Sequence, residues 1–363
     1  MTSWWLVDDS PEEATSFAQN LSKEEALSIV YTSVKDAAAA LDNGTLEAAG
    51  ILMDVDLSNE TGRKQTGPGL SQDIRVAQQK QTIPPFPIVR FSLRDKVLQN
   101  IGRDSSSDDL FDLKIEKDGL SAEEARTAAQ AKLIGVRKIY DALQSRMTDV
   151  SLPGLVGLAP GDWQKWGSTA FQSDFESGDR VHLRAGPFIR MMVHPGLLID
   201  EDVLGFRLGL NIKASTGWPT LKEKLTPYTY RGVAANCFPR WWARGIEEWW
   251  QDELAAESPL AGCTIGKRVE HLSRLAGELV PLTMPKGSMG DRPWRYCLLT
   301  KEQRQEAIPV DPSKSVKIRP RSPMPAWLDP LYAALGVALQ NPDDSRLDNG
   351  DLRRLQLFTR TEQ

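Results

Sequence analysis

The first 120 residues of this 363-residue sequence predict an α/β fold built on a five-stranded parallel sheet. Five short apolar segments follow one another along the chain, and segments of helical character separate them, as in βαβ units. Each apolar segment is continuous rather than alternating, which is typical of parallel strands buried on both faces. A region of different character follows and predicts a separate α+β domain.

The five strands are expected at short runs rich in branched and aromatic residues. They are Trp4–Val7, Leu27–Val34, Gly50–Met53, Pro87–Phe91 and Phe111–Ile115. Helices are expected between them at Pro11–Leu21, Lys35–Leu41 and Gly69–Gln79. Ser10 and Pro11 are residue types that favour the N-cap and first turn of a helix.

A long helix is expected over Ser121–Met147, after the fifth strand. Ser121 and Glu124 have the spacing of a capping box. Apolar residues from Ala125 to Leu143 recur at helical spacing. A helix of this length spans ~40 Å, which is more than a small α/β domain needs to close. The N-terminal domain is therefore expected at residues 1–147.

Residues 148–160 are expected to link the two domains, because Val150–Pro160 is rich in Gly and Pro. Apart from Trp4 and Trp5, all the tryptophans lie after this linker. The C-terminal domain, residues 161–363, is expected to mix strands and helices. The expected strands are Val181–Leu183, Phe206–Ile212 and Tyr296–Leu299, and the expected helices are Trp241–Leu254, Val269–Leu279 and Leu331–Leu339.

Composition excludes several classes of protein. The net charge of −5 argues against a chain that binds nucleic acid over its whole surface. Three cysteines and three histidines are scattered, so neither a disulfide scaffold nor a zinc ribbon is expected. No apolar run reaches the ~20 residues that span a bilayer, and the acidic N-terminus is unlike a secretory signal. We therefore expect a cytoplasmic protein without a membrane partner.

Polar residues stand where the predicted strands end. Asp8 and Asp9 follow the first strand, Asp54 follows the third, Ser92 follows the fourth, and Lys117 follows the fifth. The carboxyl ends of parallel strands meet at one edge of a sheet, where such folds bind their ligands. These five side chains are therefore expected to form one site.

The motifs that hold these residues are LVDDSP at 6–11, ILMDVDL at 51–57, IVRFS at 88–92 and IEKDGL at 115–120. Taken together and in this order, they resemble the receiver domain of bacterial response regulators. The resemblance covers about residues 3–146. It implies a flavodoxin-like (βα)5 fold and a role as a phosphoprotein in two-component signal transduction.

The resemblance also implies a role for each site residue. Asp54 would accept a phosphoryl group from a histidine kinase. Asp8, Asp9, Asp54 and the main-chain carbonyl of Asp56 would bind Mg²⁺, a hard ion that prefers oxygen ligands. Ser92 would donate its hydroxyl to the phosphoryl oxygens, and Lys117 would pair with Asp54 or with its phosphate.

Two of these roles, that of the phosphoryl acceptor and that of the lysine, each have a second candidate residue. Asp56 competes with Asp54 as the acceptor, but Asp54 directly follows the apolar strand and is favoured. Lys114 competes with Lys117, which is favoured because Lys-Asp-Gly-Leu leads into the next helix, as the family pattern often does.

The sequence departs from the family pattern at three places. Asp118 replaces the proline that often follows the lysine, and the segments Ser58–Pro68 and Arg103–Asp109 are insertions. A receiver-shaped scaffold that no longer accepts phosphate therefore stays open as an alternative.

The C-terminal half shows no recognisable enzyme motif, so whether it is an enzyme stays open. Asp200 to Asp202, with Lys213, suggest either a metal-dependent nuclease or a solvated turn. The tryptophan-rich stretch 238–254 suggests either a domain core or a partner surface. The basic run Lys314–Arg321 suggests either contacts to nucleic acid phosphates or a solvated linker.

The leading functional expectation is a signalling switch. Phosphorylation of Asp54 would change how the receiver packs against the C-terminal domain or against another receiver. The family resemblance suggests that the face of the fourth helix, fifth strand and fifth helix mediates a homodimer, with the 121–147 helix in it. The C-terminal domain would then bind or regulate a protein partner.

Overall fold

The computed structural model describes residues 2–23, 25–57, 66–93, 110–145, 151–252, 254, 258–303, 306–320 and 322–361. The chain separates into two compact units. The first unit comprises Met1–Leu158, Phe171–Arg190 and Arg231–Phe238, and the second comprises Ala159–Ala170, Met191–Tyr230 and Pro239–Gln363. Two stretches of the C-terminal half thus belong to the first unit.

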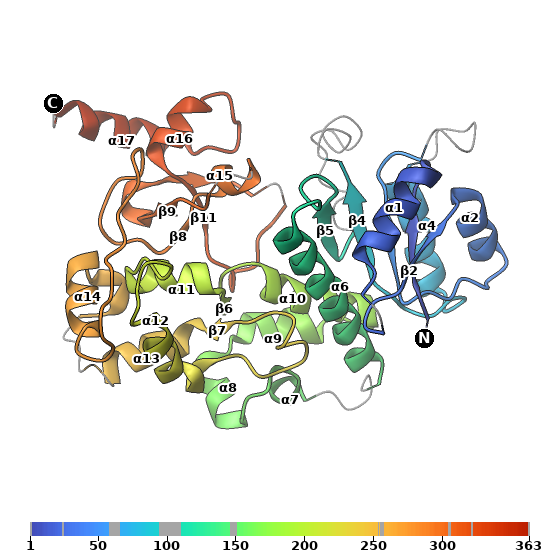
Figure 1. The fold of residues 1–363 in the computed structure, drawn as a ribbon, viewed down its shortest axis with the longest axis horizontal. Coiled ribbons are helices and arrows are strands. Elements are labelled where there is room, and N and C mark those ends of the chain that lie inside the picture. Colours follow the sequence, from blue (N-terminus) through green and yellow to red (C-terminus); the bar gives the residue numbers. More distant parts are fainter. Residues whose placement is uncertain are drawn as a thin grey trace. The chain divides into compact units, whose positions relative to one another are not determined.

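The first unit is built on a five-stranded sheet in which every neighbouring pair is parallel. Its strands are β1 Trp4–Val7, β2 Ile29–Thr32, β3 Gly50–Met53, β4 Ile88–Ser92 and β5 Leu113–Glu116, in the order β2-β1-β3-β4-β5 (Figure 1). This order is that of a flavodoxin-like sheet, so the predicted α/β fold class is confirmed. Most of the first predicted insertion, residues 58–65, and all of the second lie outside the described residues.

Helices cover both faces of this sheet. They are α1 Pro11–Leu21, α2 Val34–Asp42, α4 Gly67–Gln79 and α6 Glu123–Gln144. α2 and α4 pack on one face, where their buried residues join Val7, Ile51 and Ile88 in a core. α1 and α6 contact each other, and Phe17 of α1 packs edge-on against Phe91 of β4 on the other face.

Side-chain caps mark where two of these helices, α2 and α4, begin. The Ser33 hydroxyl accepts a hydrogen bond from the Asp36 amide, and the Thr66 hydroxyl accepts one from the Gly69 amide. The capping box predicted at Ser121 is wrong: α6 begins at Glu123, with Ala122 as an N-cap that makes no side-chain bond. The turn before α6 is instead closed by its backbone, through the Ala122 amide and the Gly119 carbonyl.

The described residues after 151 are mainly helical. The helices are α7 Leu152–Val156, α8 Pro160–Trp166, α9 Thr169–Glu176, α10 Val181–Val193, α11 Glu201–Leu208, α12 Trp218–Lys224, α13 Ala243–Asp252, α14 Ile265–Leu272, α15 Leu298–Glu302, α16 Leu335–Gln340 and α17 Asn349–Thr361, with single 3₁₀ turns at Thr226–Tyr228, Leu260–Gly262 and Pro312–Lys314. The strands pair in three two-stranded antiparallel ribbons: β6 Leu198–Ile199 with β7 Trp241–Trp242, β8 Arg295–Tyr296 with β9 Pro309–Val310, and β10 Val316–Ile318 with β11 Leu331–Ala333.

Several predicted elements of this half are wrong. The strand expected at 181–183 lies in α10, and the first three residues of the strand expected at 206–212 form the end of α11. The Asp200 side chain caps α11 by accepting from the Val203 amide at 2.9 Å, and Gly209 ends the helix with a φ of 71°. These caps outweigh the short alternation of apolar residues. The helix expected at 331–339 begins as β11, because Leu331–Ala333 pair with β10.

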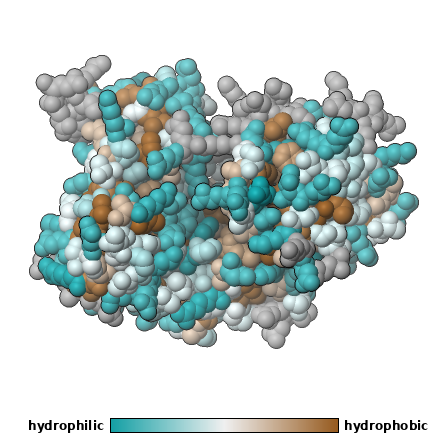
Figure 2. Space-filling model, in the orientation of Figure 1, coloured by the Kyte–Doolittle hydropathy of each residue, from teal (hydrophilic) through white to brown (hydrophobic). Residues whose placement is uncertain are grey.

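The tryptophans expected at a core or at a partner surface belong to the core. Trp241, Trp242, Trp249 and Trp250 are almost wholly buried, and three of them lie in one cluster with Ile199, Leu204 and Ile246. Figure 2 shows one face of the molecule, on which small brown hydrophobic areas lie among hydrophilic residues. Among the described residues, no helix combines the length and the apolar character needed to cross a bilayer.

Candidate functional site

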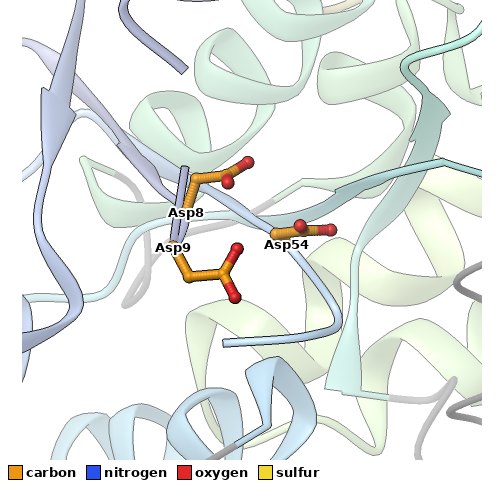
Figure 3. Close-up of side chains that lie close together, drawn as sticks. All are labelled: Asp8, Asp9 and Asp54. Carbon is orange, nitrogen blue, oxygen red and sulfur yellow. The ribbon is translucent and has the colours of Figure 1, made fainter. Parts of the chain in front are cut away.

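The carboxyl ends of β1 and β3 place three aspartates side by side. Val7 is paired with Met53 in the register of the two strands, so Asp8 and Asp54 leave the sheet at the same level. The Asp54 amide donates a hydrogen bond to the Val7 carbonyl at 3.0 Å and extends the pairing by one residue. Asp9 follows in the turn before α1. Figure 3 shows the three side chains grouped at these strand ends.

These three carboxylates are buried and close together. Asp8, Asp9 and Asp54 are 1%, 6% and 0% exposed, and each offers an oxygen within 4.8 Å of the other two. The Ser10 amide donates to Asp8 Oδ1 at 2.9 Å, and the Val55 amide donates to Asp54 Oδ1 at 2.8 Å. Several buried negative charges in one place are costly unless cations compensate them.

Lys117 supplies one such cation. It follows β5, is 3% exposed, and places its Nζ 3.2 Å from Asp54 Oδ2. The same ammonium forms an ion pair and a hydrogen bond with Asp8 Oδ2. Burial raises the pKa of Asp8, Lys117 opposes that rise, and the neighbouring Asp54 adds to it. The site therefore holds carboxylates that one lysine does not fully neutralise.

The donor set fits a hard divalent cation. Three buried carboxylates with mutually close oxygens match the ligand preference of Mg²⁺. A cation would relieve the repulsion between Asp8 and Asp54, which adds to the effect of burial in raising the Asp8 pKa. Asp8, Asp9 and Asp54 are the residues that would hold it. Among the described residues, this is the one group of at least three His, Cys, Asp or Glu side chains with ligand atoms this close.

Ser92 ends β4 beside this group. Its carbonyl accepts a hydrogen bond from the Lys117 amide at 3.1 Å, which ties the ends of β4 and β5 together. The side chain is 1% exposed, yet its Oγ has no hydrogen-bond partner among the described residues. A buried hydroxyl without a partner is uncommon and calls for an explanation such as a ligand.

The two competing residues lie differently from the favoured ones. Lys114 is exposed, whereas Lys117 is buried against the carboxylates. Asp56 is half-buried two residues beyond Asp54, in an isolated β-bridge with Thr66, and its carboxylate is not part of the close group. The role expected for Asp56 belongs to its main-chain carbonyl and stays a prediction.

Sequence reasoning missed Gly67, the first residue of α4. A Cβ at this position would lie 1.8 Å from the main-chain oxygen of Asp54, so only glycine lets α4 approach the backbone at Asp54. The Gly67 amide also donates to the Val55 carbonyl at 2.8 Å. The run Gly67-Pro68-Gly69 is the signal that could have pointed to this close backbone approach.

Three of the candidate residues of the C-terminal half, Asp200, Glu201 and Arg319, have structural partners. Asp200 caps α11, and Glu201 accepts hydrogen bonds from Trp218 Nε1 and Lys222 Nζ, both at 2.8 Å. In the basic run, Arg319 forms an ion pair with Asp348 at 3.2 Å. Arg321 lies outside the described residues.

No protein-family model matches the chain, and no curated protein matches it in sequence. Three solved structures share a low similarity with it. The adenylate cyclase from Rhodopirellula baltica is 13% identical over 41% of this chain and 98% of its own, with a TM-score of 0.31. A fusion protein with the yeast Spc42 trimeric coiled coil is 18% identical over 40% and 84%, with a TM-score of 0.26.

The third is RcsB from Salmonella enterica serovar Typhimurium, bound to promoter rprA in the presence of phosphomimetic BeF3⁻. It is 15% identical over 46% of this chain and 91% of its own, with a TM-score of 0.26. TM-scores at this level carry no argument about function.

Proposed function

We propose that the first unit is a receiver domain in which Asp54 accepts a phosphoryl group and thereby switches the C-terminal half. One observation carries this proposal: three buried carboxylates and a buried lysine meet at the carboxyl edge of a parallel sheet of order β2-β1-β3-β4-β5. Buried acids of this kind contribute little to stability, because desolvation opposes their interactions. Their concentration at a ligand-binding edge instead favours a chemical role.

The chemistry is a group transfer to a carboxylate. An oxygen of Asp54 forms a bond to phosphorus, the bond from phosphorus to the donor atom breaks, and the leaving group departs with that electron pair. The product is an acyl phosphate on Asp54. Asp8, Asp9 and Asp54 would hold Mg²⁺, which would supply charge stabilisation for the transferring phosphoryl group.

The remaining residues hold the phosphoryl oxygens. The Lys117 ammonium, 3.2 Å from Asp54, attracts the added negative charge. The unpartnered Ser92 hydroxyl donates to a phosphoryl oxygen and gains the partner that it otherwise lacks among the described residues. Both side chains then change their contacts when Asp54 is modified, as a switch requires.

The phosphodonor in this proposal is the phosphohistidine of a histidine kinase. The reader of the switch is a protein partner or a second copy of the chain. The buried tryptophans and the paired acids give no specific support to a nuclease, and the ion pair of Arg319 weakens the DNA-binding alternative. The second unit therefore acts, in this proposal, as an output domain that the receiver regulates.

The test is intact-mass spectrometry of the full chain after incubation with Mg²⁺ and acetyl phosphate. The expected result is the gain of one phosphoryl group in the wild type and in Asp56→Asn, and none in Asp54→Asn. Autophosphorylated histidine kinases are tried in parallel as phosphodonors, because a receiver can depend on its own kinase. A gain that persists in Asp54→Asn contradicts the assignment. Absence of a gain with every donor, together with absence of Mg²⁺ binding, leaves the receiver-shaped scaffold.

A further inference from the structure

One face of α6 is covered by residues 231–238, a segment of the C-terminal half that belongs to the first unit. A Cβ at Gly135 would lie 2.4 Å from the Phe238 ring and 2.9 Å from the Cβ of Cys237. Since real Cβ atoms do not come so close, glycine at this position permits the packing. Phe238 is 2% exposed and is therefore held against the helix.

Two hydrogen bonds hold the residues that directly precede this contact in the segment. Lys138, one turn after Gly135, donates from Nζ to Asn236 Oδ1 at 3.2 Å. The Val233 amide donates to the Leu155 carbonyl at the end of α7, at 2.8 Å. Ala234 adopts a φ of 62°, in the left-handed region that residues other than glycine rarely occupy. A conformation of this kind persists only where its surroundings hold it.

The other end of α6 is tied to the acceptor site. The Leu120 amide donates to the Lys117 carbonyl at 3.4 Å, and the Ala122 amide donates to the Gly119 carbonyl at 3.1 Å, directly before α6 begins. Lys117 itself pairs with Asp54 at 3.2 Å. A change of charge at Asp54 therefore acts on Lys117. Hydrogen-bonded turns connect Lys117 to Ala122, the N-cap of α6.

We propose that α6 carries the phosphorylation signal from Asp54 to residues 231–238, and through them into the second unit of the same chain. This inference rests on the proposed function. The sequence continues from both ends of the segment directly into second-unit residues, Met191–Tyr230 and Pro239–Gln363. A shift of the segment therefore has to be accommodated by the second unit.

The inference also restricts where two chains can pair. The face of α6 that carries Gly135 and Lys138 is occupied by the chain itself. A receiver–receiver contact through this face would have to displace Phe238 and the bond to Asn236. The segment thus takes the place that a second receiver would need on this side of the helix.

The test is hydrogen exchange of the full chain, measured by mass spectrometry with Mg²⁺ alone and with Mg²⁺ and acetyl phosphate. Intact mass is recorded on the same samples, so that the extent of phosphorylation is known. In the wild type, phosphorylation is expected to change exchange in 231–238 by about fivefold, the lower end of typical coupling between sites. Lys138→Ala should keep the phosphoryl gain and the change in α6 but reduce the change in 231–238.

Arg137→Ala is the matched control, because Arg137 is the neighbouring residue and donates a hydrogen bond to the Ala49 carbonyl, at 2.8 Å. It is expected to retain the wild-type response in 231–238. A phosphorylated wild type whose 231–238 exchange does not change overturns the inference and leaves the proposed function standing. A response equal in Lys138→Ala and wild type also overturns it. Absence of a phosphoryl gain on Asp54 is the separate outcome in which the proposed function fails as well.

Discussion

Lys117 Nζ lies 3.2 Å from Asp54 Oδ2, and both side chains are almost completely removed from solvent. The two residues come from the ends of β5 and β3, which lie on either side of β4 in the sheet. The ammonium also pairs with Asp8, so one buried cation serves two buried carboxylates. This shortage of positive charge is what makes the site suited to a divalent cation.

Replacing Lys117 with methionine should destabilise the folded chain, because the buried carboxylates lose their compensating cation. Removing one partner of a buried ion pair leaves an uncompensated charge and typically costs about 3–5 kcal/mol. We expect a loss of this size in the free energy of unfolding of Lys117→Met, measured by urea denaturation without Mg²⁺. Added Mg²⁺ should recover more stability in the variant than in the wild type, because it replaces the missing positive charge.

The control for this experiment is Lys114→Met, since Lys114 is exposed three residues earlier on β5. Its stability should change by no more than about 0.5 kcal/mol. An equal effect of the two substitutions would contradict the assignment of Lys117 as the compensating cation.

Ser92→Ala should lower the phosphorylation rate of Asp54 without lowering the free energy of unfolding. The hydroxyl has no partner among the described residues, so its removal leaves no group unpaired and should not lower the free energy of unfolding. If the hydroxyl holds a phosphoryl oxygen, the phosphorylation rate of Asp54 should fall by about 10²-fold, as for the loss of one donor to a transition-state oxygen. Both quantities are measured, by urea denaturation and by the time course of the intact mass.

Ser71→Ala is a closely matched control, because Ser71 is also buried in the first unit and its Oγ also lacks a partner among the described residues. It lies on α4 rather than at a strand end. Its phosphorylation rate should equal that of the wild type. If Ser71→Ala and Ser92→Ala slow phosphorylation equally, the effect is a general one of packing and the role of Ser92 is refuted.

The sheet and the strand-end residues could be predicted because both have local signals. Buried parallel strands read as continuous apolar runs, and the polar residue after each run marks its end, as with Asp54 and Lys117. The unpartnered Oγ of Ser92 could not be predicted, because it depends on what surrounds the side chain. The same holds for Gly67, whose close approach to Asp54 depends on the packing of α4.

The C-terminal half was less predictable for a physical reason. Its strands have two or three residues and exist through pairing with distant segments, as β6 does with β7. The pattern Phe206-Leu208-Leu210-Ile212 fits a strand, but the cap from Asp200 and the turn at Gly209 decide for a helix. Nor does any local signal show that residues 231–238 pack with the first unit.

Gly67→Ala should disturb the backbone at Asp54 directly. The added methyl group would lie 1.8 Å from the Asp54 carbonyl oxygen, so the backbone of α4 or at Asp54 has to move. We expect a loss of about 1–3 kcal/mol in stability, as for overpacking, together with weaker Mg²⁺ binding measured by calorimetry. In Gly69→Ala the nearest atom is the Thr66 hydroxyl oxygen at 3.3 Å, so the effects should be much smaller. Equal Mg²⁺ affinity in both variants would contradict a tight contact at Gly67.

His182 should make the stability of the first unit depend on pH. Partial burial lowers the pKa of this imidazole below its usual value of 6.5, and the Arg75 charge lowers it further. The Asp112 charge raises the pKa and opposes these two effects. Smaller effects come from Arg180, which lowers the pKa, and Asp179, which raises it. Arg75 and Asp112 are themselves joined at 2.7 Å, and Tyr140 donates to Asp112 at 2.9 Å. His182 therefore faces a charged network that is already paired.

The sign of the effect is set by the lowered pKa. The unfolded chain takes up a proton on His182 near pH 6.5, whereas the folded chain does so only at lower pH. The stability that the neutral imidazole contributes is thus present above the unfolded pKa and is lost as the pH falls through the interval between the two pKa values. Between about pH 7.5 and 5.5, the range in which histidine changes charge, His182→Gln should lose less stability than the wild type, as measured by urea denaturation at each pH. Parallel curves for the two proteins would show that protonation of His182 is not linked to folding, and would place the acid sensitivity on the carboxylates instead.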